Sequence, residues 1–174
     1  NTLALAIGTY LGLKLREITL LTERLEYTAK HDHLTGAVTR GHFYEWILTP
    51  GIWPCAIILA DIDNFKAIND THGHPIGDAV LKSFAAMLIR EIREMDIAVR
   101  MGGEEFAIIM PCSDGSSAYA LAERIRKAAM SLKLPNSLRL TASFGVSATQ
   151  DPNDTLEQLF SRTDKLLYKA KTQG

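Results

Sequence analysis

The sequence predicts an α/β fold in which helices surround a central sheet. Apolar runs that are typical of β-strands alternate along the chain with amphipathic stretches of helical period. The chain has 174 residues, of which 47% are hydrophobic, and this is enough for the core of one compact unit. The sequence contains no internal repeat and no low-complexity segment, so we expect neither a repeat architecture nor a disordered chain.

The first thirty residues are predicted to form one long helix that differs in character from the rest of the chain. Residues 2–8 are apolar, but crossing a bilayer takes about 20 residues. This start is either the last turns of a membrane helix, with the following basic residues on the cytoplasmic side, or part of a linker helix after an upstream sensor domain. In both cases Leu11, Ile18 and Leu25 are spaced seven apart and can form a dimer seam.

Five elements are predicted over residues 40–110. The clearest is a helix in which apolar residues recur at spacings of three and four. A hairpin is indicated by two apolar runs on either side of a Gly-Gly pair. In chain order the elements are a helix near 40–48, a strand over 54–62, a short helix over 64–70, the amphipathic helix over 77–93 and the hairpin over 96–110.

Three more elements complete the predicted fold. A further helix is marked by apolar residues at helical spacing, which are Leu121, Ile125, Ala129 and Leu132. Residues 138–148 alternate as a strand. Asp154 with Glu157 resembles a capping box, which places the start of the last helix there.

Charge and cysteine content limit the functions to be considered. The net charge of -1 gives no basic face of the kind that binding to nucleic acid requires, so we expect no nucleic-acid partner. The two cysteines, Cys55 and Cys112, are too few for a disulfide framework and are typical of a reducing compartment.

The tip of the predicted hairpin combines glycines with acids. Gly102 and Gly103 support a two-residue turn because both turn positions tolerate positive φ, and glycine lets the backbone approach a phosphate closely. Glu104 and Glu105 follow directly and can hold a divalent cation, which a triphosphate needs beside carboxylates. Taken alone, the segment is equally compatible with a solvated hairpin.

A second acidic site follows the predicted strand over 54–62. This apolar run ends in Asp61-Ile62-Asp63, and acids at a strand end suggest metal ligands. The alternative is a strand-end acid in solvent. His72 and His74 nearby lie in a turn rich in Gly and Pro, where a structural role is expected in place of metal binding.

Five ordered motifs resemble the GGDEF domain of diguanylate cyclases. The resemblance covers roughly residues 31–174. The motifs are DHLTG at 32–36, DIDNFKAINDTHGHPIGD at 61–78, MGGEEF at 101–106, TASFGV at 141–146 and TDKLLYKAK at 163–171.

The resemblance implies a fold and an activity. The fold is α+β, with a mainly antiparallel sheet surrounded by helices, similar to the palm of nucleotide cyclases and polymerases. The activity is the condensation of two GTP into cyclic di-GMP and two pyrophosphates, which serves bacterial second-messenger signalling. Residues 1–30 would be a signalling and dimerisation helix, and residues 31–174 the catalytic domain. We expect a cytoplasmic domain, either of an inner-membrane protein or of a soluble one.

The predicted metal site follows from the chemistry and from the resemblance together. Attack of a ribose 3′-hydroxyl on an α-phosphate needs charge neutralisation, which two Mg²⁺ ions can supply, with Mn²⁺ as an alternative. The carboxylates of Asp61 and Glu104 fit this role, and the resemblance adds the backbone carbonyl of Ile62. It also names Glu104 as the base, although magnesium alone can acidify the hydroxyl.

Nucleotide contacts are predicted mostly from the resemblance. Lys66 and Lys171 would meet the phosphates, together with the backbone amides of Phe65 and Lys66 at a helix start. The carboxylate of Asp78 and the amide of Asn69 match the edge of guanine. The remaining predicted substrate-binding residues are His74, Gly102, Gly103 and Glu105.

A regulatory site and one departure from the family pattern complete the sequence-based predictions. Arg93 and Asp96 stand at the position of the family's RxxD motif, so the resemblance implies product inhibition by cyclic di-GMP, with Arg124 contributing from a second surface. Thr39 replaces the usual asparagine of the LTGLxNR motif, and we expect weaker coupling of the N-terminal helix to the domain.

Each domain has one nucleotide site, so condensation of two GTP molecules implies a homodimer. The alternative to an enzyme is a silent receptor for GTP or cyclic di-GMP, and a weaker one is a dimerisation module. Degenerate receptors typically lose the hairpin acids, and their presence here favours the enzyme.

Overall fold

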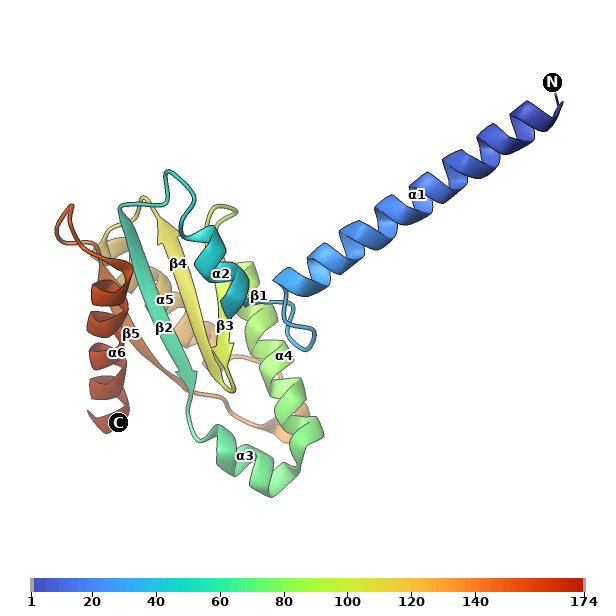
Figure 1. The fold of residues 1–174 in the computed structure, drawn as a ribbon. Helices are drawn as coiled ribbons and strands as arrows, with labels where there is room; N and C mark the ends of the chain where they lie inside the picture. The colour runs from blue at the N-terminus through green and yellow to red at the C-terminus, as the bar shows by residue number, and fades with distance from the viewer. Residues whose placement is uncertain (1, 174) are drawn as a thin grey trace.

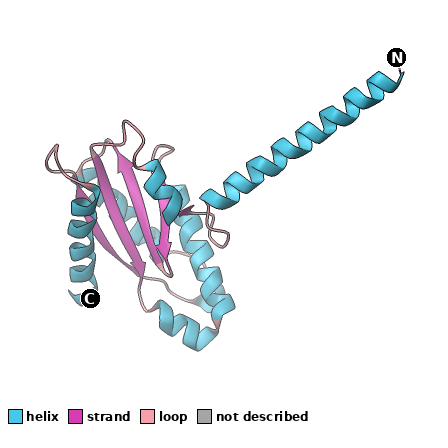
Figure 2. Cartoon of the chain, viewed as in Figure 1, coloured by secondary structure: helices cyan, strands magenta, loops and turns pink. Residues whose placement is uncertain are grey.

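The computed structural model describes the backbone of residues 2–173 and the side chains of residues 7–173. Helices pack on both faces of one sheet, and the N-terminal helix projects away from it (Figures 1 and 2). The elements are α1 (Thr2–Lys30), β1 (Val38–Thr39), α2 (Arg40–Trp46), β2 (Cys55–Ile62), α3 (Phe65–His72), α4 (His74–Glu91), β3 (Ile97–Gly102), β4 (Glu105–Pro111), α5 (Gly115–Met130), a 3₁₀ turn (Pro135–Ser137), β5 (Ala142–Ala148) and α6 (Leu156–Gln173).

The sheet has the strand order β1-β3-β4-β2-β5 and is mainly antiparallel. β2 pairs with β4 on one side and with β5 on the other, and both pairings are antiparallel. β1 pairs with β3 in parallel over two residues only. The predicted α/β fold with a mainly antiparallel sheet is therefore confirmed, although β1 is too short to leave a pattern in the sequence.

Successive residues of β2 enter two different cores. Ile58 and Ile62 belong to the core beneath α4 and α5, whereas Ile57 and Leu59 belong to the core beneath α2 and α6. This follows from the two-residue period of a strand. All eight residues of β2 are buried, which explains its continuous apolar run.

Helix α1 leaves the domain as an extended rod, and its long apolar side chains are exposed (Figure 1). The predicted seam residues Leu11, Ile18 and Leu25 are 56%, 58% and 72% exposed. In the described part of the chain, no helix has both the length and the apolar character needed to cross a bilayer. The apolar start predicted over residues 2–8 lies partly outside the described side chains.

Thr39 joins α1 to the domain. Its hydroxyl lies 3.3 Å from the backbone oxygens of Ala29 and Lys30, at the end of α1. The same hydroxyl oxygen accepts a hydrogen bond from the backbone N–H of His42 and caps the start of α2. Thr39 therefore provides a direct contact where its replacement of asparagine led us to expect weaker coupling.

Two predicted element boundaries are wrong, for identifiable reasons. The strand over 138–148 begins only at Ala142, because its partner β2 ends at Ile62, directly opposite. The helix over 77–93 begins one turn earlier, at His74, where Gly73 is the N-cap. Pro75 is tolerated in this first turn because the N–H that it lacks would have no partner within the helix.

The capping box of α6 is shifted by one residue from the prediction. The Thr155 hydroxyl accepts from the Gln158 backbone N–H at 3.3 Å, and the Gln158 side chain accepts from the Thr155 N–H at 2.9 Å. Asp154 instead forms an ion pair with Arg162, with 2.8 Å between Oδ2 and Nη2. This ion pair and hydrogen bonds from the Gln150 and Asp151 N–H groups keep the pKa of Asp154 low.

Gly145 allows α6 to lie against β5. A Cβ atom at this position would be 2.3 Å from the backbone oxygen of Thr163 and 2.6 Å from the backbone nitrogen of Leu167. Both atoms belong to the helix backbone and cannot rotate away. The position of α6, which carries Lys171, therefore depends on this glycine.

We expect Gly145→Ala to lower the free energy of unfolding by about 3 kcal/mol, because the added methyl group pushes α6 off the sheet. Urea denaturation measures the change. The matched control is Gly41→Ala in α2, where an added Cβ meets no atom within 4 Å. The control should change stability by less than about 1 kcal/mol. Equal stability of the two variants would contradict the close packing of α6.

Candidate active site

The turn of the β3–β4 hairpin is formed by Gly103 and Glu104, one residue later than the predicted pair. Gly102 is still paired with Glu105 and ends β3, after an irregularity in the pairing between Arg100 and Gly102. Gly103 has a φ of 48°, in the left-handed region that favours glycine. Glu104 therefore occupies the turn itself, at the tip of the hairpin.

Arg100 holds this turn in place, and sequence analysis missed it. Its Nη2 and Nε donate to the Gly103 carbonyl at 2.9 and 3.2 Å. Its Nη1 donates to Asp32 Oδ1 at 2.8 Å, and that oxygen also accepts from the N–H and hydroxyl of Thr35. Burial raises the pKa of Asp32, but the hydrogen bonds from Thr35 and Arg100 outweigh it, so the pKa is lowered. The only signal in the sequence was the position of Arg100 just before the Gly-Gly pair of the hairpin.

The acidic residues of β2 and of the hairpin are neighbours along the backbone pairing at the end of β2. Asp61 lies directly opposite Glu105 in the β2–β4 pairing, and the Ile62 N–H donates to the Glu104 carbonyl at 3.4 Å. Opposed residues of antiparallel strands point to the same face, here the face covered by α6. Glu104, in the turn, lies just beyond this pair. The structure thus brings the three predicted acids to one edge of the sheet.

These residues fit a magnesium site that the nucleotide helps to complete. Among the described residues, no group of three or more acidic, histidine or cysteine side chains could enclose a metal ion. Mg²⁺ in nucleotide enzymes is held by one or two carboxylates, with phosphates and water as the other ligands. Asp61 is buried, and Glu104 makes no side-chain hydrogen bond or ion pair within the described part of the chain. The two carboxylates thus provide the hard oxygen donors that such a site needs.

Lys171 reaches the same edge from α6. Its Nζ lies 2.5 Å from Asp61 Oδ2, although the prediction placed this lysine on a phosphate. A hollow of about 480 Å³ next to this pair is also lined by Glu105, Asp164, Lys165 and Lys169. The described structure therefore pairs the lysine with the expected metal ligand.

The predicted guanine readers are also brought together. Helices α3 and α4 meet at Gly73, whose N–H donates to the Asn69 carbonyl at 2.8 Å. The Asn69 side chain lies against Gly77, where a Cβ atom would be 1.9 Å from its Oδ1. Asp78 follows Gly77 and is exposed. The short α3–α4 connection and the missing Cβ of Gly77 therefore place the amide beside the residue that bears the carboxylate.

The other predicted nucleotide contacts lie around this end of the sheet. The end of β2, the hairpin turn and the α3–α4 pair all lie at one end of the sheet (Figure 1). Lys66 is exposed on α3 and His74 is exposed at the first position of α4. Phe65 begins α3, but its side chain is buried in the core, so only its backbone can face a ligand.

The predicted inhibitory residues lie together at the end of α4, on another part of the surface. Asp96 Oδ2 accepts from the Arg93 backbone N–H at 3.0 Å, while its Oδ1 is buried without a partner among the described atoms. Burial raises the pKa of Asp96, and Arg93 opposes this shift. Arg124 Nε donates to the Glu91 side chain at 2.8 Å, and Glu91 precedes Arg93 by two residues. Arg124 therefore lies near the predicted inhibitory residues.

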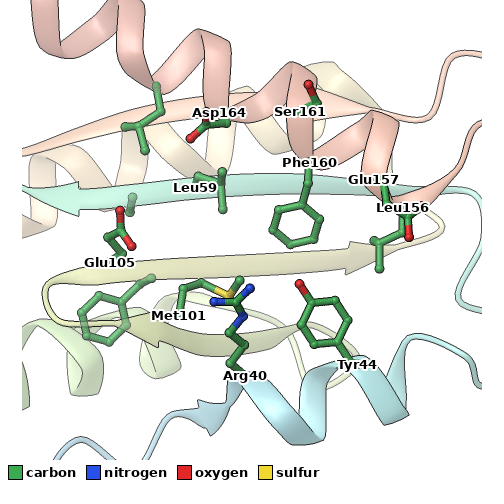
Figure 3. Close-up of a pocket in the computed structure, with 13 residues that line it drawn as sticks. Arg40, Tyr44, Leu59, Met101, Glu105, Leu156, Glu157, Phe160, Ser161 and Asp164 are labelled. Carbon is green, nitrogen blue, oxygen red and sulfur yellow. The ribbon is translucent and has the colours of Figure 1, made fainter.

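A cavity of about 400 Å³ lies beside the predicted site, between α2 and α6 (Figure 3). Leu59, Phe106 and Phe160 give it apolar walls, and Arg40 lies over the Tyr44 ring, with its guanidinium carbon 5.8 Å from the ring centroid. Of the predicted site residues, only Glu105 lines this cavity. Glu105 also lines the hollow beside Asp61, so the cavity adjoins the end of the sheet where the acids lie.

Comparisons with known proteins show the family to which the chain belongs. A family model described as "Diguanylate cyclase, GGDEF domain" matches residues 29–174. The diguanylate cyclase DgcM of Escherichia coli (strain K12) is 38% identical over 161 residues, which are 88% of this chain and 39% of that protein. The response regulator PleD of Caulobacter vibrioides is 44% identical over 126 residues, which are 70% of this chain and 28% of that protein. The chain thus spans less than half the length of these relatives.

A solved structure shares both the domain and the long helix. The coiled coil and GGDEF domain of DgcB from Caulobacter crescentus, in complex with c-di-GMP, is 29% identical, with a TM-score of 0.82. The match covers 97% of this chain and 95% of that one. With the family model matching most of its length, this chain belongs to the GGDEF-domain family of diguanylate cyclases.

Proposed function

We propose that this chain condenses two molecules of GTP into cyclic di-GMP and releases two pyrophosphates. The observation that carries the proposal is the meeting of Asp61 and Glu104 at the end of β2, held by the Ile62–Glu104 backbone hydrogen bond. The guanine-reading pair on α3 and α4 lies at the same end of the sheet (Figure 1). The site thus combines acids that can bind a metal ion with polar groups that can bind the guanine ring. This combination is what a nucleotidyl-transfer reaction requires.

Each residue has a defined task in this reaction. The Asp78 carboxylate accepts hydrogen bonds from the N1–H and N2–H groups of guanine. The Asn69 amide donates to an acceptor atom of the same guanine, O6 or N3. Lys66, Lys171 and the backbone at Phe65, Gly102 and Gly103 hold the phosphates, with His74 and Glu105 beside them. Asp61, Glu104 and the Ile62 carbonyl would hold two Mg²⁺ ions, which acidify the 3′-hydroxyl and stabilise the leaving pyrophosphate. In this proposal, Glu104 takes the proton of that hydroxyl.

The reaction also requires two copies of the chain. One nucleotide site cannot present a 3′-hydroxyl to a second α-phosphate, so two sites must face each other across a two-fold axis. The exposed apolar side chains of α1, among them Leu11, Ile18 and Leu25, support α1 as the dimerisation helix. A sensor domain preceding α1 would act on the enzyme by changing how the two helices pair.

The first test is to incubate the chain with GTP and Mg²⁺, at a protein concentration that favours dimers. Chromatography then measures the cyclic di-GMP that has formed. We expect Asp61→Asn and Glu104→Gln each to lower the rate by about 100-fold or more, because each removes a charge at the reacting phosphate. Asp70→Asn, an exposed acid on α3, is the matched control and should keep most of the activity. GTP binding without product, even in an enforced dimer, would instead indicate a receptor.

Asp78 should determine the preference for guanine. ITP lacks the 2-amino group, so we expect the wild-type chain to have a kcat/KM about tenfold or more higher for GTP than for ITP. Asp78→Asn should lower kcat/KM for GTP much more than for ITP, because the carboxylate no longer accepts from that amino group. Steady-state kinetics with both nucleotides measure the two ratios. An unchanged GTP/ITP ratio in the variant would exclude Asp78 as a guanine reader.

Product inhibition should depend on the end of α4. We expect Arg93→Ala to raise the inhibition constant for added cyclic di-GMP by about tenfold or more, because an arginine can bind phosphate or guanine with two hydrogen bonds. Arg90→Ala, which removes an exposed arginine one turn earlier on α4, should leave inhibition unchanged. Inhibition that is equal in both variants would refute the RxxD site.

A further inference from the structure

Lys171 and Asp61 form an ion pair between a partly exposed lysine and a buried carboxylate. The side chain of Asp61 is 7% exposed and that of Lys171 is 42% exposed. Among the described residues, no other side chain forms an ion pair or a hydrogen bond with the Asp61 carboxylate. The charge of the buried acid is therefore neutralised by a lysine that reaches in from the surface.

We propose that Lys171 is an internal counter-ion that competes with the divalent cation for Asp61. The inference rests on the proposed function, because it takes Asp61 to be a cation ligand. It assigns Lys171 a role in the nucleotide-free protein, before any phosphate is present. Binding of cation and nucleotide then moves the ammonium group from the carboxylate to the phosphates.

The geometry makes the two cations mutually exclusive at one oxygen. Lys171 Nζ lies 2.5 Å from Asp61 Oδ2, and a bound Mg²⁺ would lie about 2.1 Å from such an oxygen. An ammonium group and a divalent cation this close would repel each other strongly in a poorly solvated place. A buried carboxylate left without either would carry a large desolvation penalty. At Oδ2, one cation therefore replaces the other.

Lys171 has the freedom to make this exchange. It lies in the last turn of α6 (Leu156–Gln173), and its flexible side chain is partly in solvent. The hollow beside it is lined by three acids and three lysines. They are Asp61, Glu105, Asp164, Lys165, Lys169 and Lys171. An excess of one charge therefore favours neither the ion pair nor the divalent cation.

The exchange makes cation and nucleotide binding cooperative. Without nucleotide, the lysine holds the carboxylate and weakens cation binding. With nucleotide present, the phosphates attract the lysine and leave the carboxylate to the cation, so each ligand favours the other. Removing the lysine should strengthen cation binding to the free protein and weaken nucleotide binding.

The test is a titration of the nucleotide-free chain with Mn²⁺, in which electron paramagnetic resonance measures the free ion. We expect the dissociation constant of Mn²⁺ to fall by about fivefold in Lys171→Met, because a competing ion pair of ordinary strength has been removed. Lys169→Met is the matched control from the same helix and hollow, and we expect its constant to equal that of the wild type. Asp61→Asn should abolish the binding and so assign the signal to this site.

Equal Mn²⁺ affinity in the wild type and Lys171→Met would overturn the proposal, as would an absence of binding in both. GTP binding measured with Mg²⁺ should change in the opposite direction and become weaker in Lys171→Met. A general loss of structure would weaken both ligands, so the opposite signs separate the exchange from damage to the fold. The Mn²⁺ titration needs no turnover, so a chain without cyclase activity would still give a decisive result.

Discussion

The burial of β2 on both faces constrains the rest of the structure. Its residues alternate between the core beneath α4 and α5 and the core beneath α2 and α6, so both sets of helices are positioned by one strand. The strand pairs with β4 and β5 along its length, and its register places Asp61 opposite Glu105. Asp61 is buried because it belongs to β2, all of whose residues are covered by the packed helices and neighbouring strands. The same constraint that stabilises the fold thus creates the need for a cation at Asp61.

A second interaction links the catalytic hairpin to the end of α1. Arg100 binds Asp32 in the loop that follows α1 and, with its other nitrogens, the Gly103 carbonyl in the turn. Thr39 binds the last carbonyls of α1 and caps α2. A movement of α1 would therefore be transmitted both to α2 and to the turn that carries Glu104. In the proposed function, these short connections through β1 and β3 are a physical route from α1 to the site.

The site combines rigid and mobile parts. Asp61 and the hairpin are fixed by strand pairing, and Asn69 is fixed by its contact with Gly77. Lys66, Asp78, His74 and Lys171 are exposed and keep the freedom of surface side chains. In the proposed reaction, acids held by strand pairing suit a metal, which needs defined geometry, and exposed lysines suit phosphates that are bound and released.

The sequence by itself determined the class of fold and its helices and strands other than β1, because apolar periodicity and turn glycines are local features. It also supplied the proposed site residues, through acids at strand ends and through motifs that resemble the GGDEF family. It could not determine contacts between distant segments. The turn at Gly103 and Glu104 and the Thr155–Gln158 cap lie one residue from their predicted positions, and β5 begins four residues later than predicted, at Ala142. Strand pairing and helix packing select among such nearby alternatives. Arg100 on Asp32 and Lys171 on Asp61 join residues 68 and 110 positions apart. Only the tertiary structure decided these ion pairs, because a charge finds its partner through the packing of the whole chain.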